Sequence, residues 1–321
     1  MAVYTEITDD EAEAFLADYE LGGISALKGI AEGVENSNYF LLTDRGQFIL
    51  TLYEKRVDEA DLPFFIALLD GLVEQGIPCP KPVRARDGKA LRRLADRPAC
   101  IVTFLEGMSP RRVRPFQCGA VGQALAELHL AGGKLEGVHR DNSLSIGSWR
   151  ALFDSVGPRA NEVQAGLADA VERELDILER DWPTDLPTGL IHADLFPDNV
   201  FFHRDQLTGL IDFYFACVDA LAYDLSVCLN AWCFEPDGSF NITNAQLLLS
   251  RYRAVRPPSE EELQALPILA RGSAMRFLLT RLYDWVNQQP DALVRPKDPL
   301  EFLRRLRFHQ QARGPEAYGL V

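Results

Sequence analysis

The pattern of apolar and polar positions changes along the chain near residue 105. Before that point apolar residues mostly alternate with polar ones, which is typical of half-buried strands. Ser37–Thr43 and Gln47–Tyr53 are two such runs, and the turn Asp44-Arg45-Gly46 between them predicts a hairpin. Further strands are predicted at Pro82–Arg86 and Lys89–Leu94, around a turn at Asp87-Gly88, and at Ala99–Leu105.

Two helices are predicted within this strand-rich part. Thr8-Asp-Asp-Glu11 has the sequence of a capping box in front of an amphipathic helix, which we expect to end at Gly22-Gly23. Asp61–Gln75 has helical periodicity and is stopped by Gly76. After Glu106-Gly107 the periodicity is mainly helical, over 115–131, 162–181 and most of 219–312, with two short strands within 190–213.

These elements predict an α+β protein with two domains. The first, residues 1–105, is a small antiparallel sheet with an inserted helix, and the second, residues 106–321, is larger and mainly helical. The length of 321 residues is enough for a sizeable core in each.

Composition narrows the class of protein. Apolar residues make up 47% and charged residues 25% of the chain, which excludes a disordered polypeptide. The net charge of −14 argues against binding to nucleic acid or to an anionic membrane. The first ten residues lack a signal-peptide pattern, and the most apolar stretch, 209–234, contains three aspartates, so no membrane span is expected. Six cysteines without a CxxC pair predict reduced core residues in a cytoplasmic protein.

The residues that indicate chemistry are His192, Asp194, Asn199 and Asp212. Asn199–His203 and Thr208–Phe213 are predicted as a hairpin with a four-residue turn between them, and symmetric pairing would place Asn199 opposite Asp212. Asp194 lies in the loop before the first strand. The sequence therefore predicts that an amide and two carboxylates meet at one end of a hairpin.

Such a set of oxygen atoms suits Mg²⁺ and phosphoryl transfer. Mg²⁺ prefers hard oxygen ligands, and phosphoryl transfer needs a metal on the phosphates and a carboxylate that accepts the proton of the attacking hydroxyl. Asp194 would be that base, with Asn199 and Asp212 as metal ligands. The H-x-D-x-x-x-x-N spacing, followed by an Ile-Asp-Phe strand end, is the catalytic-loop pattern of kinases.

Other interpretations of the same residues remain open at this point. Asp194 and Asn199 would also serve as turn caps, and Asp212 as a strand end, although a carboxylate within an apolar run is costly. His192 is expected to hold the loop through a hydrogen bond, and His129 to be a satisfied helix histidine. A metallohydrolase would instead bind zinc or iron through His192, Asp194, His203 and Asp212.

The chain resembles the aminoglycoside-phosphotransferase-like kinases, which share the two-lobed protein-kinase-like fold. The order of the sheet with its inserted helix, the His192 to Asn199 loop and Asp212 is the order in that family. Within the family the chain is most similar to the homoserine kinases. The strings that carry this similarity are Gly33–Tyr39, Phe48–Glu54, His192–Phe202, Ile211–Cys217, Ala222–Leu225, Leu229–Cys233 and Arg276–Trp285.

The resemblance implies a role for each matching residue and the use of ATP and Mg²⁺. It implies that Asp194 is the catalytic base, that Asn199 and Asp212 bind magnesium, and that Asp224 steadies the catalytic loop, unless Asp224 is a simple N-cap. One departure is the third strand, Leu50-Thr51-Leu52, which lacks the usual phosphate-binding cation, so that Lys28, Lys55 or Arg56 would have to replace it. The resemblance places the loop over the ATP phosphates at Gly33, Asn36 and Ser37, and the adenine-binding hinge at Phe104, Leu105 and Glu106.

The resemblance also implies a small-molecule substrate, homoserine, whose hydroxyl is phosphorylated to give O-phosphohomoserine for threonine synthesis. Its carboxylate needs a cation or N–H donors, and Arg276 and Arg281 are candidate cations unless they extend to solvent. Tyr214 would border the substrate. Candidate ammonium acceptors are Asp219, Asn230 and Asp284. Alternatives are a kinase of the same fold for an amino alcohol, a sugar or an aminoglycoside, and a nucleotide-binding scaffold without turnover.

Overall fold

The computed structural model describes residues 5–30, 36–54, 58–288 and 296–320. The chain forms two compact units, and each is described by itself. The N unit comprises Met1–Gly107 together with Leu135–Val138 and Thr208–Tyr214, and the C unit comprises the rest. The boundary drawn from the sequence at residue 105 lies close to the end of the first of these segments.

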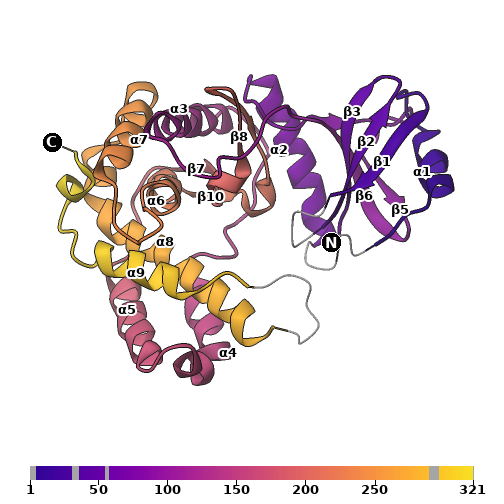
Figure 1. The fold of residues 1–321 in the computed structure, drawn as a ribbon. Helices are drawn as coiled ribbons and strands as arrows, with labels where there is room; N and C mark the ends of the chain where they lie inside the picture. Colours follow the sequence, from indigo (N-terminus) through magenta and orange to yellow (C-terminus); the bar gives the residue numbers. More distant parts are fainter. Residues whose placement is uncertain (1–4, 31–35, 55–57, 289–295, 321) are drawn as a thin grey trace. The chain divides into compact units, whose positions relative to one another are not determined.

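The N unit contains a six-stranded antiparallel sheet in the order β1-β2-β3-β6-β4, with β5 also paired to β6 (Figure 1). The predicted hairpin at Ser37–Thr43 is confirmed, and the pairing of Thr43 with Gly46 leaves only Asp44 and Arg45 in its turn. The strands are β1 (Ile24–Gly29), β2 (Ser37–Thr43), β3 (Gly46–Leu52), β4 (Pro82–Val83), β5 (Leu91–Leu94) and β6 (Arg97–Thr103).

Helices cover both faces of this sheet. Successive residues of a strand point to opposite faces, so the neighbours of each side chain show which helix covers its face. In β3 and β6, Leu50 and Ile101 pack with Phe15 of α1 (Asp9–Leu16) on one face. On the other face, Cys100 packs with Phe65 of α2 (Leu62–Glu74). Figure 1 shows the two helices on either side of the strands. The sheet is thus covered on both faces, whereas the alternating pattern read from the sequence predicted half-buried strands.

Three details of the N unit differ from the prediction. α1 begins with the predicted capping box but ends at Leu16, well before Gly22. The turn at Asp87-Gly88 forms, yet it does not join paired strands, since β4 and β5 both pair with β6. The second hairpin instead turns at Ala95 and Asp96, whose φ angles of 49° and 58° suit a tight two-residue turn despite the absence of glycine.

The C unit is mainly helical, as predicted, with a small antiparallel strand pair, β7 with β10. A second antiparallel pair joins β8 with β9, and the residues of β9 from Thr208 onward belong to the N unit. The helix α4 and the β7–β10 pair were not predicted. The helices are α3 (Pro115–Gly132), α4 (Ile146–Val163), α5 (Leu167–Asp181), α6 (Leu221–Trp232), α7 (Ile242–Val255), α8 (Glu260–Val286) and α9 (Leu300–His309). The strands are β7 (Thr188–Ile191), β8 (Val200–His203), β9 (Gln206–Leu210) and β10 (Cys217–Ala220).

The central element of the C unit is α6, whose twelve residues are all buried. β7 runs directly into His192, and β10 runs directly into α6. Ile191 pairs with Cys217, at the end of β10 farthest from α6, and hydrogen bonds to Asp224 in the first turn of α6 hold the start of the predicted catalytic loop against that helix. Tight packing of α3 on α7 closes this region, since a Cβ added to Gly122 would lie 2.1 Å from the backbone oxygen of Leu248.

All six cysteines are buried and unpaired, as expected of reduced core residues. Burial raises the pKa of the Cys79, Cys100, Cys118 and Cys217 thiols to about 12. Within the described ranges, no helix combines the length and the apolar character that crossing a membrane requires.

Candidate active site

The backbone of the loop that follows β7 is held by Asp224 of α6. The Asp224 carboxylate accepts hydrogen bonds from the backbone N–H of His192 at 2.7 Å and of Ala193 at 2.9 Å. A third hydrogen bond joins it to Nε2 of His129 at 3.1 Å. The N-cap of α6 is Ala220, so the interpretation of Asp224 as a simple N-cap is wrong. The hydrogen bonds to His192 and Ala193 confirm the interpretation that Asp224 steadies the loop.

Burial alone would raise the pKa of the Asp224 carboxyl, which is fully buried. The hydrogen bonds from His129 and from the backbone outweigh that effect and hold the pKa below its ordinary value. His129 is itself buried and hydrogen-bonded through both ring nitrogens, as predicted for a satisfied helix histidine. Asp224 is therefore a fixed, charged acceptor under the loop.

Ala193 adopts a left-handed backbone conformation, with φ of 62°. Residues other than glycine rarely adopt this conformation, and it persists only where the surroundings impose it. Here the N–H of Ala193 is bound by Asp224, and its carbonyl accepts a hydrogen bond from Nη1 of Arg276. Both polar backbone groups of Ala193, the N–H and the carbonyl, are thus held by hydrogen bonds directly before Asp194.

Asp194 and Asn199 lie together at the end of this loop, as predicted. The side-chain nitrogen of Asn199 donates to the Asp194 carbonyl at 2.8 Å and to its Oδ2 at 3.0 Å. Asn199 is buried and Asp194 is partly exposed. The nearby imidazole of His192 accepts the backbone N–H of Asp194 at 3.3 Å, in agreement with a loop-holding role. Since its amide nitrogen faces Asp194, the amide oxygen of Asn199 points away from that carboxylate.

The hairpin after Asn199 forms, but its turn is shorter than predicted. β8 and β9 pair around Arg204 and Asp205, so the four-residue turn through Leu207 is wrong. The opposition of Asn199 and Asp212 was derived from that turn and does not follow from the observed one. Asp212 comes two residues after β9 in a left-handed conformation, with φ of 65°. It belongs to the N unit, while Asp194 and Asn199 belong to the C unit.

Tyr214, predicted to border the substrate, packs within the N unit. Its ring lies edge-on to those of Tyr53 and Phe65, at centroid distances of 5.8 and 5.5 Å. Burial and the neighbouring Tyr214 phenol raise the pKa of the Tyr53 hydroxyl well above its ordinary value. Tyr214 is therefore held by an aromatic cluster next to α2.

The two candidate anion-binding arginines have different surroundings. Arg276 is buried in α8, donates to the Ala193 carbonyl, and lies over the ring of Phe277 at 4.5 Å. Its Nε is buried without a hydrogen-bond acceptor among the described residues. Arg281, one turn further along, donates to Glu301 at 2.6 Å, so its charge is already partnered. Neither arginine simply extends into solvent.

The predicted phosphate loop is only partly described. Gly33, Lys55 and Arg56 lie outside the described residues. Asn36 is buried and its Oδ1 accepts the Glu54 N–H at 3.2 Å, and Ser37 donates to the Glu54 carboxylate at 2.8 Å. In β3, Thr51 is buried and donates to Asn38 at 2.7 Å. Lys28 is exposed on β1.

The predicted hinge Phe104-Leu105-Glu106 follows β6 without regular structure. The Phe104 N–H donates to the Gln47 carbonyl at 3.3 Å, and the Glu106 carbonyl accepts the Thr208 hydroxyl at 2.6 Å. Leu105 packs closely on Gly209, because a Cβ added to Gly209 would lie 2.7 Å from the Leu105 side chain. The segment is thus fastened to the sheet at one end and to β9 at the other.

The candidate ammonium acceptors come from three different elements, β10, α6 and α8. Asp219 accepts a hydrogen bond from Asn142 at 2.6 Å, a contact that nothing in the sequence suggested. Asn230 is buried and donates to the Ala270 carbonyl at 3.0 Å, whereas Asp284 is exposed. Among the described residues, no three histidine, cysteine or carboxylate side chains lie together so that they could hold a metal ion.

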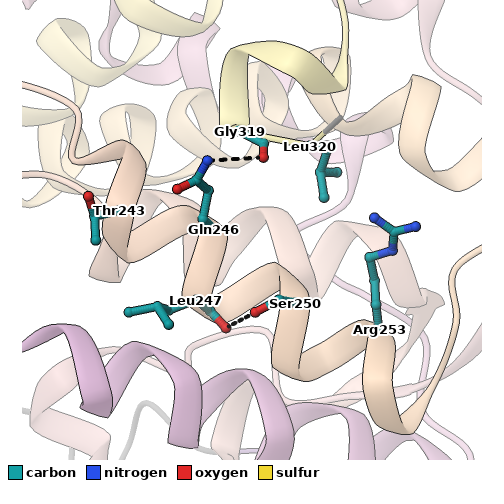
Figure 2. Close-up of a pocket in the computed structure, with 7 residues that line it drawn as sticks. All are labelled: Thr243, Gln246, Leu247, Ser250, Arg253, Gly319 and Leu320. Carbon is teal, nitrogen blue, oxygen red and sulfur yellow. Dashed lines mark hydrogen bonds between the residues drawn. The ribbon is translucent and has the colours of Figure 1, made fainter.

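A shallow pocket lies elsewhere in the C unit, between α7 and the C-terminal segment (Figure 2). Its lining includes Gln246, which donates to the Gly319 carbonyl at 3.3 Å. None of the residues predicted for catalysis or for binding ATP or substrate lines it.

Comparisons with known proteins agree with this geometry. The phosphotransferase enzyme family matches residues 26–258, which include the whole catalytic loop and Asp224. The protein named homoserine kinase from Rhodospirillum rubrum is 61% identical over 320 residues, covering 100% of this chain and 99% of that protein. Its counterpart from Parvibaculum lavamentivorans is 60% identical, with the same coverage.

Solved structures share the fold at low sequence identity. An amicoumacin kinase, solved with AMP-PNP, Ca²⁺ and Ami, has a TM-score of 0.72 at 16% identity. The match covers 98% of this chain and 94% of the amicoumacin kinase chain. An aminopropanol kinase has a TM-score of 0.67 at 17% identity, and the match covers 95% of this chain and 97% of the aminopropanol kinase chain. These matches confirm the predicted protein-kinase-like fold.

Fold and loop together define an ATP-using phosphotransferase of the protein-kinase-like type. The chain belongs to the phosphotransferase enzyme family, in the branch of the homoserine kinases. The alternatives of a metallohydrolase and of a scaffold without enzymatic activity are thereby set aside.

Proposed function

We propose that the protein is a homoserine kinase, which transfers the γ-phosphoryl group of ATP to the hydroxyl of L-homoserine and yields O-phosphohomoserine. The observation that carries this proposal is the Asp194–Asn199 pair on a loop braced by Asp224, in a chain about 60% identical over its full length to proteins of that name. The product serves threonine synthesis, and a cytoplasmic location fits the use of ATP.

In this proposal Asp194 is the catalytic base. Its Oδ2 accepts a hydrogen bond from the Asn199 amide, which orients the carboxylate that is to accept the proton of the substrate hydroxyl. Phosphoryl transfer depends chiefly on positioning and on charge stabilisation. The fixed Ala193 and His192 peptides therefore contribute by holding Asp194 in one place, where the nucleophilic oxygen can approach the phosphate in line.

We assign magnesium binding to Asn199 and Asp212. An amide oxygen and a carboxylate are the hard donors that Mg²⁺ prefers, and the outward-pointing amide oxygen of Asn199 fits that use. When bound, the ion neutralises charge on the ATP phosphates. For the nucleotide itself we assign the phosphates to Gly33, Asn36 and Ser37, and adenine to the hinge at Phe104, Leu105 and Glu106.

For the substrate we assign Tyr214, Arg276 and Arg281. Arg276 is the better candidate for the homoserine carboxylate, because its Nε is a buried donor without an acceptor among the described residues, and such a donor gains most from an anionic ligand. Arg281 is the alternative, and its ion pair with Glu301 would have to be shared with the ligand.

The test is a coupled assay of ADP release by the purified protein with homoserine, choline, methylthioribose or an aminoglycoside as acceptor, in the presence and absence of magnesium. We expect a clear preference for homoserine, measured as kcat/KM, and dependence on magnesium. A preference for another acceptor would replace homoserine as the substrate while keeping the enzyme class. No ATP consumption with any alcohol would overturn the proposal.

A further inference from the structure

A chain of hydrogen-bonded side chains links the junction of α7 and α8 to the catalytic loop. Nη1 of Arg256 lies 2.9 Å from the Tyr252 hydroxyl, which lies 2.7 Å from Nδ1 of His129. Nε2 of His129 lies 3.1 Å from Asp224, which holds the His192 and Ala193 peptides. All these residues belong to the C unit. Tyr252, His129 and Asp224 are buried, so water does not compete for these contacts.

The chemistry of the two ends, with a neutral imidazole at His129 between them, gives every link in this chain a single direction. A guanidinium only donates, so the Tyr252 oxygen accepts from Arg256. Asp224, with its lowered pKa, is an ionised acceptor, so Nε2 of His129 carries a hydrogen. In a neutral imidazole the other nitrogen, Nδ1, carries a lone pair, so it accepts the hydroxyl hydrogen of Tyr252.

The outer end of the chain is fixed to the backbone of two helices. Arg256 is the C-cap residue of α7, and its Nη2 donates to Glu262 at 2.9 Å. Glu262 is buried, and its other oxygen accepts the Ser259 N–H at 2.8 Å in the capping box that begins α8. The position of Arg256, and hence of the Tyr252 hydroxyl, is therefore set by the helix junction.

We propose that Tyr252 and Arg256 are positioning residues for phosphoryl transfer, which act by fixing the tautomer of His129. With Nδ1 occupied by the Tyr252 hydroxyl, His129 always presents Nε2–H to Asp224. Without that hydroxyl the other tautomer becomes accessible, and it turns a lone pair toward the Asp224 carboxylate. Asp224 then loses one of the contacts that hold it under His192 and Ala193, and Asp194 loses its fixed position. The inference uses the proposed function only for the choice of substrate.

The same unit contains a matched pair that serves as a control. The Tyr318 hydroxyl lies 3.0 Å from Nδ1 of His309, whose Nε2 lies 3.2 Å from the side-chain oxygen of Asn230. Tyr318 and His309 are as deeply buried as Tyr252 and His129. This second Tyr–His pair does not lead to Asp224. Tyr318→Phe therefore removes a tyrosine hydroxyl from a histidine Nδ1, as Tyr252→Phe does, but leaves the hydrogen bonds of Asp224 to the loop in place.

The kinetic test compares Tyr252→Phe, Arg256→Lys and Tyr318→Phe with the unchanged protein, after circular dichroism has established equal folding. We expect Tyr252→Phe to lower kcat by about tenfold or more, since small displacements of a catalytic group have effects of that size. We expect KM for ATP and homoserine to change less than about twofold. Arg256→Lys, which keeps a positively charged donor, should lose less, and Tyr318→Phe should keep its kcat. Equal losses of kcat in the two tyrosine variants, or a change in KM alone, would overturn the proposal.

A second readout needs no substrate and so separates this inference from the proposed function. The chain has five histidines, and ¹⁵N labelling distinguishes a protonated ring nitrogen from an accepting one in each. In the unchanged protein we expect the His129 signal of an Nε2–H tautomer with an accepting Nδ1, and in Tyr252→Phe a mixture of tautomers. A protonated Nδ1 in the unchanged protein would overturn the inference even if homoserine is the substrate.

Discussion

The carboxylate of Asp224 holds the N–H of Ala193 in a left-handed conformation, directly before Asp194. This contact joins a buried charge on α6 to the residue proposed as the base. A left-handed alanine costs roughly 1–3 kcal/mol, so the loop keeps this shape only while its hydrogen bonds persist. Stability and catalysis are therefore coupled at Asp224.

Replacing Asp224 by asparagine should destabilise the protein by roughly 2–3 kcal/mol at neutral pH, because an amide cannot accept from both backbone N–H groups and from His129 at once. The free energy of urea unfolding measures this. Asp237→Asn is the control, since Asp237 is exposed and bonded only to nearby Ser239 among the described contacts. An Asp224 variant as stable as this control would contradict the account.

The effect of Asp224→Asn should also depend on pH. The pKa of Asp224 is lowered from 3.8, so the folded state binds its proton less readily than the unfolded state. The resulting stability is complete above pH 3.8 and is lost as the pH falls through the lower folded pKa. The difference in unfolding free energy between the unchanged protein and the variant should therefore narrow in strongly acidic buffer. A constant difference from neutral pH downward would mean that the charge of Asp224 is not what stabilises the loop.

Asp194→Ala should lower kcat by about 10²–10⁴-fold with little change in ATP affinity, because a general base acts mainly in the transition state. Steady-state kinetics and nucleotide titration measure the two effects. Asp198→Ala is a matched control on the same loop, since Asp198 is exposed and pairs only at the surface, with Lys297 at 3.2 Å. Near-normal turnover of the Asp194 variant would remove that residue from the role of base.

Asp212→Ala should weaken binding of ATP in the presence of magnesium by roughly tenfold or more, as expected when an ion loses a direct ligand. Calorimetric titration at fixed magnesium gives the affinity. Asp205→Ala, at the exposed turn of the same hairpin, should bind ATP normally. If the Asp212 variant binds ATP as tightly as the unchanged protein, the metal ligand assignment fails.

Strand alternation and helical periodicity were enough to predict the sheet, its inserted helix and the helical remainder. Both patterns are local, because burial of a face of an element determines which of its residues are apolar. The loop was found because the spacing of His192, Asp194 and Asn199 is itself a local pattern. Asp224 was recognised only through the family resemblance, since its partners lie about thirty residues earlier in the sequence. Contacts over such separations leave no periodic trace in the chain.

The errors have equally specific causes. The turn at Arg204 was placed over four residues because Gln206 and Leu207 carry no strand signal, whereas Arg204 adopts a positive φ of 56° that allows a two-residue turn. The turn at Ala95 and Asp96 was missed for the same reason, since glycine is the usual signal for such angles. The contact of Arg276 with the Ala193 carbonyl spans 83 residues and could be found only from the fold.

The six buried cysteines should not react with a thiol reagent in the folded protein. Burial raises their pKa, so the reactive thiolate is scarce, and the sulfur atoms are shielded from reagents. Titration with a chromogenic disulfide should count fewer than one thiol at neutral pH without denaturant and six in guanidinium chloride. Rapid reaction of several thiols in the folded state would show that the core opens readily.

Arg276→Met and Arg281→Met should separate the two candidates for the homoserine carboxylate. We expect Arg276→Met to raise KM for homoserine by about tenfold, since a charge-assisted contact is lost, and to lower kcat, since the Ala193 carbonyl loses its donor. Arg281→Met should change KM for homoserine less, because Glu301 already partners that guanidinium. ATP affinity should stay unchanged in both variants, as measured by nucleotide titration. A larger rise of KM in the Arg281 variant would move the carboxylate site to Arg281, and an unchanged KM in both would place it on neither arginine.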